Sequence, residues 1–248
     1  MGVPSNYTLR SNPTIPVDQG LYEQSTTKKT ELGTKLEIGE RTFRYAKAGV
    51  TVTAGGILCA PAPVTTACAT GIIPVAGAVG DVVITVTCSG AAVTTDQYID
   101  GYIGIASGNG AGEMYRIKQH DLGTASTGTT AVKFTLYDPL VTAPTATSLS
   151  FIIPNPYNGA FMSAAATGCP VGASMITVTA GNYFWLQTKG LCNVLGAAAN
   201  TGLNAVYLGT SGSVLCNLAG TSPKAEIGVV PECTGVTTVK QPIFLNLE

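Results

Sequence analysis

The chain has a single histidine, His120, and Asp121 follows it directly. With a serine from elsewhere in the fold, such a pair could form the relay that activates a nucleophile. A relay needs its acid to reach the imidazole from another part of the fold, because adjacent residues seldom point at each other. We therefore interpret His120 as a polar histidine in a turn and not as a catalytic base.

Acidic residues offer two further arrangements. Asp96 and Asp100 bracket Tyr98 and carry the oxygen ligands that calcium prefers, but a calcium loop needs several more oxygens at regular spacing. Glu113 and Asp121 could act as the carboxyl pair of a glycoside hydrolase, yet nothing in the sequence brings them to one face. We expect the two aspartates to cap turns and face solvent in loops, and we assign no acid–base pair.

A glycine-rich segment, residues 107–112, has the composition of a loop that cradles phosphate. Such a loop leads into a helix and is followed by Lys and Ser or Thr, whereas this segment lies between two strand-like runs. The segment is therefore predicted to be the tip of a hairpin.

The seven cysteines have neither the spacing nor the neighbours of a metal site. Most of them lie among Ala, Val, Leu and Thr, where cysteine behaves as a small buried hydrophobe. We expect reduced thiols in a protein made in a cytoplasm, and one inter-sheet disulfide remains an open alternative. The predicted site therefore contains no catalytic residue, no cofactor and no metal, and we expect that the protein is not an enzyme. The positions are Cys59, Cys68, Cys88, Cys169, Cys192, Cys216 and Cys233.

Charged residues are scarce and concentrated at the start of the chain. They make up 11% of the 248 residues, and 12 of the 27 fall within the first 50 positions. The net charge of −1 provides no basic patch for phosphate or for anionic lipid, so we predict neither a nucleic-acid partner nor a membrane partner. The sequence begins without a secretory signal pattern, and no segment reads as a membrane span. With a mean hydropathy of +0.30, much of the surface is expected to be buried against partners.

The elements that would position these residues are predicted to be strands. Good helix formers are rare, and no apolar set keeps a period of 3.6 residues. Many short strands with frequent turns are typical of a small β-barrel or sandwich, so the predicted class is all-β. The clearest β-branched or aromatic runs are 42–46, 82–87, 102–105, 113–117, 132–137, 149–153, 175–178, 183–188, 206–208, 225–230 and 242–247.

Two segments divide the chain. Residues 1–31 are rich in Pro, Ser, Thr and Asn and are predicted to form an extended N-terminal arm. Such an arm is either an unstructured tail or a segment that orders on a neighbouring subunit. Residues 154–159, Pro-Asn-Pro-Tyr-Asn-Gly, are the strongest candidate for a domain boundary.

Three stretches resemble the capsid decoration (cement) proteins of tailed bacteriophages. They are residues 40–45 with the glycines that follow at 49, 55 and 56, the glycine-bounded strand 181–190, and 227–230 with the final strand 242–247. Residues 112–117 and 137–140 resemble an extra domain of larger phage structural proteins. The resemblance implies a barrel-like cement domain from 32–60 plus 161–248, with a β domain at 61–160 inserted; a linear arrangement with the second domain appended is the alternative.

The resemblance also implies a function. The expected protein binds the outer surface of a phage capsid, with the major capsid protein as its partner, and bridges neighbouring capsid subunits. Self-association as a homotrimer and location in the virion, after synthesis in the host cytoplasm, follow from the same resemblance. The candidate capsid-docking residues, which would meet an acidic shell, are Arg10, Tyr22, Lys28, Lys29, Arg41, Arg44 and Lys47. The candidate barrel core is Phe43, Phe184, Trp185, Leu186 and Phe244.

Three other functions compete with this one. A receptor- or glycan-binding module of a phage head fibre or tail would show exposed aromatic residues at loop tips, for which Tyr98, Tyr102 and Tyr157 are candidates. A bacterial surface-layer or adhesin domain would need a secretion signal. A hydrolase would depend on Glu113.

Overall fold

β-Strands form all regular elements in the described part of the chain, apart from one short 3-10 turn at Thr210–Gly212. The computed structural model describes residues 18–62, 73–88, 92–122, 130–165, 168–197, 205–216, 225–231 and 239–248. In these ranges the strands pair into two antiparallel sheets, which confirms the predicted all-β class. No helix among these residues is long and apolar enough to cross a membrane.

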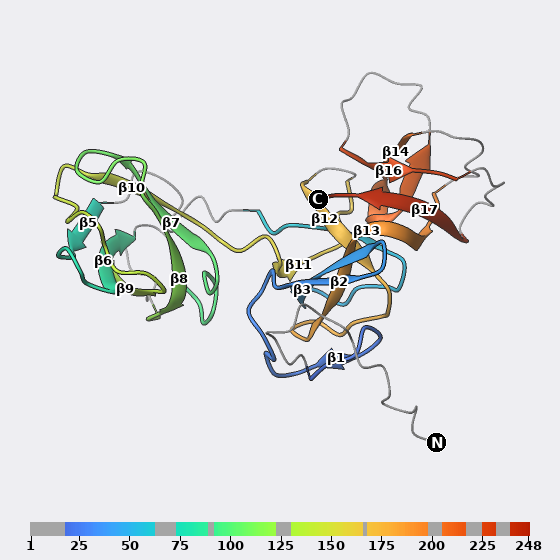
Figure 1. The fold of residues 1–248 in the computed structure, drawn as a ribbon, viewed down its shortest axis with the longest axis horizontal. Helices are drawn as coiled ribbons and strands as arrows, with labels where there is room; N and C mark the ends of the chain where they lie inside the picture. Colours follow the sequence, from blue (N-terminus) through green and yellow to red (C-terminus); the bar gives the residue numbers. More distant parts are fainter. Residues whose placement is uncertain are drawn as a thin grey trace. The chain divides into compact units, whose positions relative to one another are not determined.

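The chain divides into two compact units (Figure 1). Unit 1 comprises Met1–Pro61 and Gly159–Glu248, and unit 2 comprises Ala62–Asn158. Unit 2 is thus one continuous segment that interrupts unit 1 in sequence. The division falls within two residues of the predicted boundaries at 60/61 and 160/161.

Strand β13 (Tyr183–Leu195) is the centre of unit 1. It is thirteen residues long and pairs with four other strands. The main path of the sheet is β11 (Asn158–Ala160), β3 (Arg41–Ala48), β13, β17 (Lys240–Asn246), β16 (Glu226–Val229), β14 (Ala205–Leu208) and β15 (Val214–Cys216). The strands off this path are β1 (Gln24–Ser25), β2 (Lys35–Ile38), β4 (Ile57–Cys59) and β12 (Pro170–Ser174).

Unit 2 has a six-stranded sheet of its own. Its order is β10 (Leu149–Ile153), β7 (Tyr102–Ser107), β8 (Met114–His120), β9 (Thr130–Leu136), β6 (Val83–Cys88) and β5 (Ile73–Ala76). The glycine-rich residues 107–112 connect the antiparallel strands β7 and β8, so the predicted hairpin tip is present.

Each unit has a separate core. Buried and exposed side chains alternate along β17, as expected for a sheet with one covered face, whereas the first six residues of β13 are buried on both faces. In unit 1, Phe43, Phe184, Trp185 and Leu186 are fully buried. The largest buried side chains of unit 2 are Tyr98, Phe134, Ile84 and Ile103.

Phe244 is not a core residue, so that part of the predicted barrel core was wrong. It is 48% exposed, whereas its neighbours Ile243 and Leu245 are buried. In β17 the side chains alternate between the two faces of the sheet. Because Ile243 and Leu245 occupy the inner face, Phe244 must point outward.

The described part of the N-terminal arm, residues 18–31, lies on unit 1 of its own chain. The Gln19 side chain is buried; its Nε2 donates to the carbonyl of Tyr183 (3.0 Å) and its Oε1 accepts from the hydroxyl of Tyr45 (2.9 Å). Trp185 Nε1 donates to the carbonyl of Gln19 (3.1 Å), and β1 pairs with β13. For these residues the structure therefore shows neither a free tail nor an arm ordered on a neighbour.

The cysteines differ from the expectation of seven reduced thiols. Cys88 is disulfide-bonded, so the expectation that all the thiols are reduced was wrong. Cys59, Cys169 and Cys192 form no disulfide. Burial raises the pKa of the Cys192 thiol to about 11, so this thiol stays protonated and unreactive at neutral pH.

Candidate interaction surface

Charges on the strands are mostly basic, although the chain as a whole is slightly acidic. Among the strands that the structure describes, nine residues are basic and only two, Glu37 and Glu226, are acidic. Most of the described acidic residues lie in loops instead. The sheet faces therefore favour an acidic partner. The nine are Lys35, Arg41, Arg44, Lys47, Arg116, Lys118, Lys133, Lys189 and Lys240.

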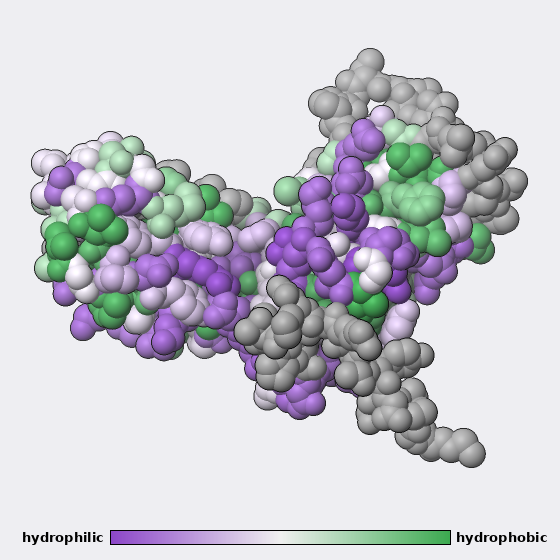
Figure 2. Space-filling view, in the orientation of Figure 1, coloured by the Kyte–Doolittle hydropathy of each residue, from purple (hydrophilic) through white to green (hydrophobic). Residues whose placement is uncertain are grey.

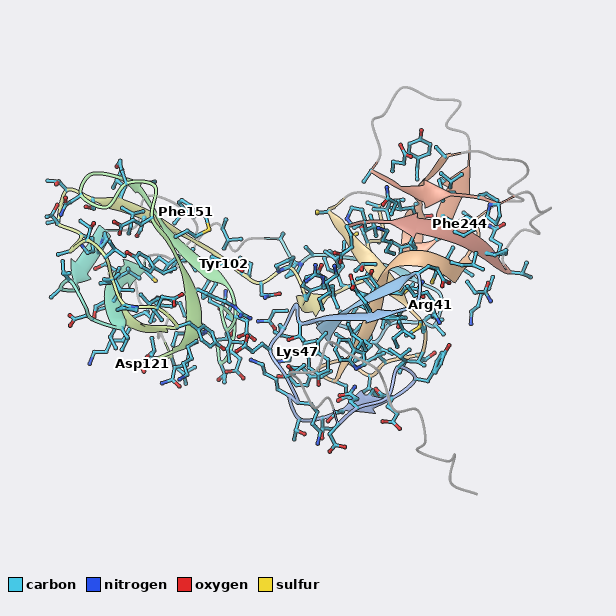
Figure 3. All side chains as sticks on the ribbon, in the orientation of Figure 1. Arg41, Lys47, Tyr102, Asp121, Phe151 and Phe244 are labelled. Atoms are coloured by element: carbon cyan, nitrogen blue, oxygen red, sulfur yellow. The ribbon has the colours of Figure 1, made fainter. Side chains whose placement is uncertain are left out.

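Three exposed apolar side chains form a row across the outer face of the unit 1 sheet. Phe244 of β17 is directly opposite Leu191 of β13 and Val229 of β16. Their exposed fractions are 48%, 43% and 41%. Figure 2 shows hydrophobic residues gathered over β16 and β17, and Figure 3 labels Phe244 there. Contiguous exposed apolar side chains of this kind are typical of an interaction surface.

Polar and cationic residues border this row. Lys189 lies two residues before Leu191 and pairs with Asn246, while Asn193 on the other side pairs with Pro242. Lys240 is exposed at the start of β17. An apolar centre with a polar rim is the usual composition of a protein–protein interface. We call the apolar residues Leu191, Phe244 and Val229, together with Lys189 and Lys240 at their border, the outer row of unit 1.

Close backbone packing brings the strands of the outer row together. A Cβ added to Gly228 of β16 would lie 1.9 Å from the carbonyl oxygen of Phe244. Only glycine allows β16 to approach β17 this closely, and that approach sets Val229 beside Phe244.

Arg44, a predicted docking residue, is engaged within its own chain. Its Nε and Nη2 each donate to a carboxylate oxygen of Glu248 at 2.8 Å. The hydrogen bond from Arg44, followed by that from the Thr188 hydroxyl, lowers the pKa of Glu248 despite partial burial. The pair is therefore fully charged at neutral pH and fixes the end of the chain against β3 and β13.

Arg41 and Lys47 lie on the opposite face of β3 from Arg44, because side chains alternate along a strand. Arg41 Nη2 donates to Gln187 Oε1 (2.8 Å), and its guanidinium lies 4.9 Å from the centre of the Phe43 ring. Lys47 Nζ lies 5.6 Å from the centre of the Tyr183 ring. Lys47 thus contacts the aromatic cluster of unit 1, which consists of Tyr45, Tyr183 and Trp185. Neither Arg41 nor Lys47 belongs to the outer row.

The remaining docking candidates belong to the arm. Tyr22 is largely exposed and Lys29 is exposed, whereas Lys28 is half-buried. The backbone N–H of Lys29 donates to the Tyr45 hydroxyl (3.1 Å), which ties this segment to the core. Arg10 lies outside the described residues.

His120 is the last residue of β8, so its placement in a turn was wrong. Its Nε2 accepts from the backbone N–H of Tyr98 (3.1 Å), and its Nδ1 lies 2.9 Å from the carbonyl oxygen of Asp121. Because Nε2 accepts, the neutral ring donates from Nδ1. Both ring nitrogens are used to hold the segment around Tyr98 against β8.

The acidic candidates Asp100 and Glu113 also accept hydrogen bonds from other residues of unit 2. Asp100, expected in solvent, is fully buried; its Oδ1 accepts from the Tyr137 hydroxyl (3.0 Å) and lies 3.5 Å from Arg116 Nη2. Glu113 accepts hydrogen bonds from Thr142 and Tyr115. These two bonds, that from Thr142 most strongly, lower its pKa, whereas a general acid needs a raised one. In the part of the chain that the structure describes, no three His, Cys, Asp or Glu residues gather into a metal site.

No family model, no curated protein and no solved structure matches this chain. The outer row itself was missed by sequence reasoning, although a signal was present. Leu191 lies between polar Lys189 and Asn193 at alternate positions, so this pattern indicates an outward-facing side chain.

The aromatic residues named for a glycan-binding module are not gathered at loop tips. Tyr98 is buried in the core of unit 2, and Tyr157 is half-buried. Tyr102 is exposed but lies on strand β7 (Figure 3).

Proposed function

We propose that this protein is a structural virion protein that binds the outer surface of a phage capsid and bridges neighbouring capsid subunits. The observation that supports this function best is the outer row of unit 1. A sheet face with Phe244 at its centre and lysines at its rim suits a protein partner with an apolar centre and acidic surroundings. The resemblance of residues 40–45, 181–190 and 227–230 to cement proteins adds to it.

Repetition on a lattice would make such a surface effective. One row of three apolar side chains gives only a weak contact, but a protein that engages a symmetric shell at several points gains avidity. The partner in this proposal is the major capsid protein.

The test is co-sedimentation of the purified full chain with capsids of the phage that encodes it, prepared without this protein. We expect the wild type to bind, and binding to weaken as salt is raised. Phe244→Ser should weaken binding by about tenfold or more. Val50→Ser is the matched control, because Val50 is also 48% exposed in unit 1 but lies outside the row.

Two results would overturn the proposal. One is a wild-type protein that does not sediment with capsids; the other is equal binding by Phe244→Ser and Val50→Ser. Binding of the purified protein to a glycan array in place of capsids would instead support the receptor-binding alternative.

A further inference from the structure

The outer face of β10, β7 and β8 in unit 2 is a second exposed apolar surface. Phe151 of β10 is opposite Gly104 of β7, which is opposite Met114 of β8; Ile153, Tyr102 and Arg116 form the next row. Met114 is 57% exposed and Tyr102 is 38% exposed. Figure 3 labels Tyr102 and Phe151 on this sheet. We call these residues, with the exposed Leu149, the unit 2 face.

Gly104 makes this face flat. A Cβ at Gly104 would lie 2.3 Å from Cζ of Phe151, so the Phe151 ring lies directly over the β7 backbone. The Phe151 ring is thereby held in place before a partner binds, so little side-chain entropy is lost when a partner packs on it.

The composition of the unit 2 face is that of an interface core. Tyr, Phe, Met and Arg are enriched at such cores, while Glu and Asp are depleted. The six strands of unit 2 contain no acidic residue. Their charges are Arg116 and Lys118 of β8 and Lys133 of β9. Because Arg116 is ion-paired with Asp100 of the same unit (3.5 Å), Lys118 and Lys133 supply the basic character of the sheet. A partner for this face should therefore present carboxylates around an apolar contact.

Such carboxylates are present on unit 2 itself, but in its loops. Asp81, Asp96, Asp121 and Asp138 are all exposed and lie between strands. Over residues 62–158 the sequence has six acidic and three basic residues, so unit 2 has a formal charge of −3. Its basic sheet and acidic loops are complementary surfaces on one molecule, and two copies can bring them together.

We propose that the chain self-associates through unit 2, with the unit 2 face of one copy against the acidic loops of unit 2 of a second copy. The two surfaces differ, so the contact is heterologous and forms a ring when its rotation closes. This contact goes beyond capsid binding by the outer row and does not depend on it.

Sedimentation velocity of the full chain over a range of protein and salt concentrations tests the proposal. We expect the wild type to form a species larger than the 25.2 kDa monomer, and salt to favour dissociation. Met114→Lys should raise the dissociation constant by about tenfold or more. Val50→Lys is the control, because Val50 is an exposed apolar residue of unit 1 and belongs neither to the unit 2 face nor to the acidic loops.

A mixing experiment tests the heterologous geometry. The loop variant Asp121→Lys with Asp138→Lys keeps an intact unit 2 face, while Met114→Lys keeps intact loops. Each should remain monomeric alone, and their mixture should form a heterodimer through the one intact pair of surfaces. Circular dichroism and thermal unfolding establish that each variant is folded; if Met114→Lys is not, Ile153→Lys replaces it.

The proposal is overturned if the wild type is monomeric throughout, if Met114→Lys associates as the control does, or if the mixture stays monomeric. Phe244→Ser separates this contact from capsid binding, because it should lose capsids while it keeps the self-association. Failure of capsid binding alone would therefore leave the self-association standing.

Discussion

Arg44 and Glu248 lie 204 residues apart in sequence and form a two-point ion pair, with both N–O distances at 2.8 Å. The pair joins β3 to Glu248, the second residue after the end of β17. Its Glu248 side chain also accepts from the Thr188 hydroxyl (2.9 Å) on β13. The Glu248 carboxylate thereby connects the segment after β17 with β3 and with β13.

Glu248→Gln should lower the free energy of unfolding by about 0.5–1 kcal/mol at neutral pH. Because the folded pKa of Glu248 is lowered, the stabilisation is fully present above the unfolded value of roughly 4.3. It is lost as the pH falls through the folded pKa. Urea unfolding should therefore show a wild-type advantage at pH 7 that disappears in acid. Glu37→Gln is the control: Glu37 pairs with Lys35 at 2.6 Å, but both side chains are exposed, so little change is expected.

Gln19→Ala should release the arm from the aromatic cluster. The variant leaves the Tyr183 carbonyl and the Tyr45 hydroxyl without the Gln19 side chain, at a cost of about 1–3 kcal/mol. Hydrogen exchange should accelerate in residues 18–31, and Trp185 fluorescence should shift toward that of a hydrated indole. Gln24→Ala is matched to it in type and segment, but Gln24 is exposed, so a smaller loss is expected. Equal losses in the two variants would contradict the anchoring role of Gln19.

Phe184→Ala and Phe244→Ala separate core from surface in unit 1. Phe184 is fully buried, so its truncation should cost about 3–5 kcal/mol. Phe244 is half-exposed, and its truncation should cost about 1 kcal/mol or less. Chemical denaturation of both variants measures the difference. A loss of about 3 kcal/mol or more in the free energy of unfolding of Phe244→Ala would contradict the surface position of this ring.

The cysteines can be distinguished by alkylation and mass spectrometry. In the native protein Cys169 should react, because it is exposed, while the buried Cys59 and Cys192 should be protected. After denaturation without reductant all three should be labelled and Cys88 should not. Labelling of Cys88 before reduction would contradict its disulfide.

Strand content and the absence of long helices could be predicted from the sequence, because β-branched runs between glycine and proline turns have no other stable packing. The glycine-rich residues 107–112 were likewise recognisable as a hairpin tip, since no helix follows them. The environments of Asp100 and His120 could not be predicted from the sequence. Their partners, Tyr137 and Tyr98, come from other segments.

The class of fold and the scarcity of charge follow from the amino-acid sequence. The face of the sheet that each side chain occupies depends on how the strands pair. The run Ile243-Phe244-Leu245 is apolar throughout, so either alternation is compatible with it; pairing of β17 with β13 and β16 sets Phe244 outward. In the same way, the sequence places lysines on strands and aspartates between them, but the sheets turn this pattern into basic faces with acidic loops. The reason is physical: a period of two residues defines two faces, and long-range pairing chooses which of them is buried.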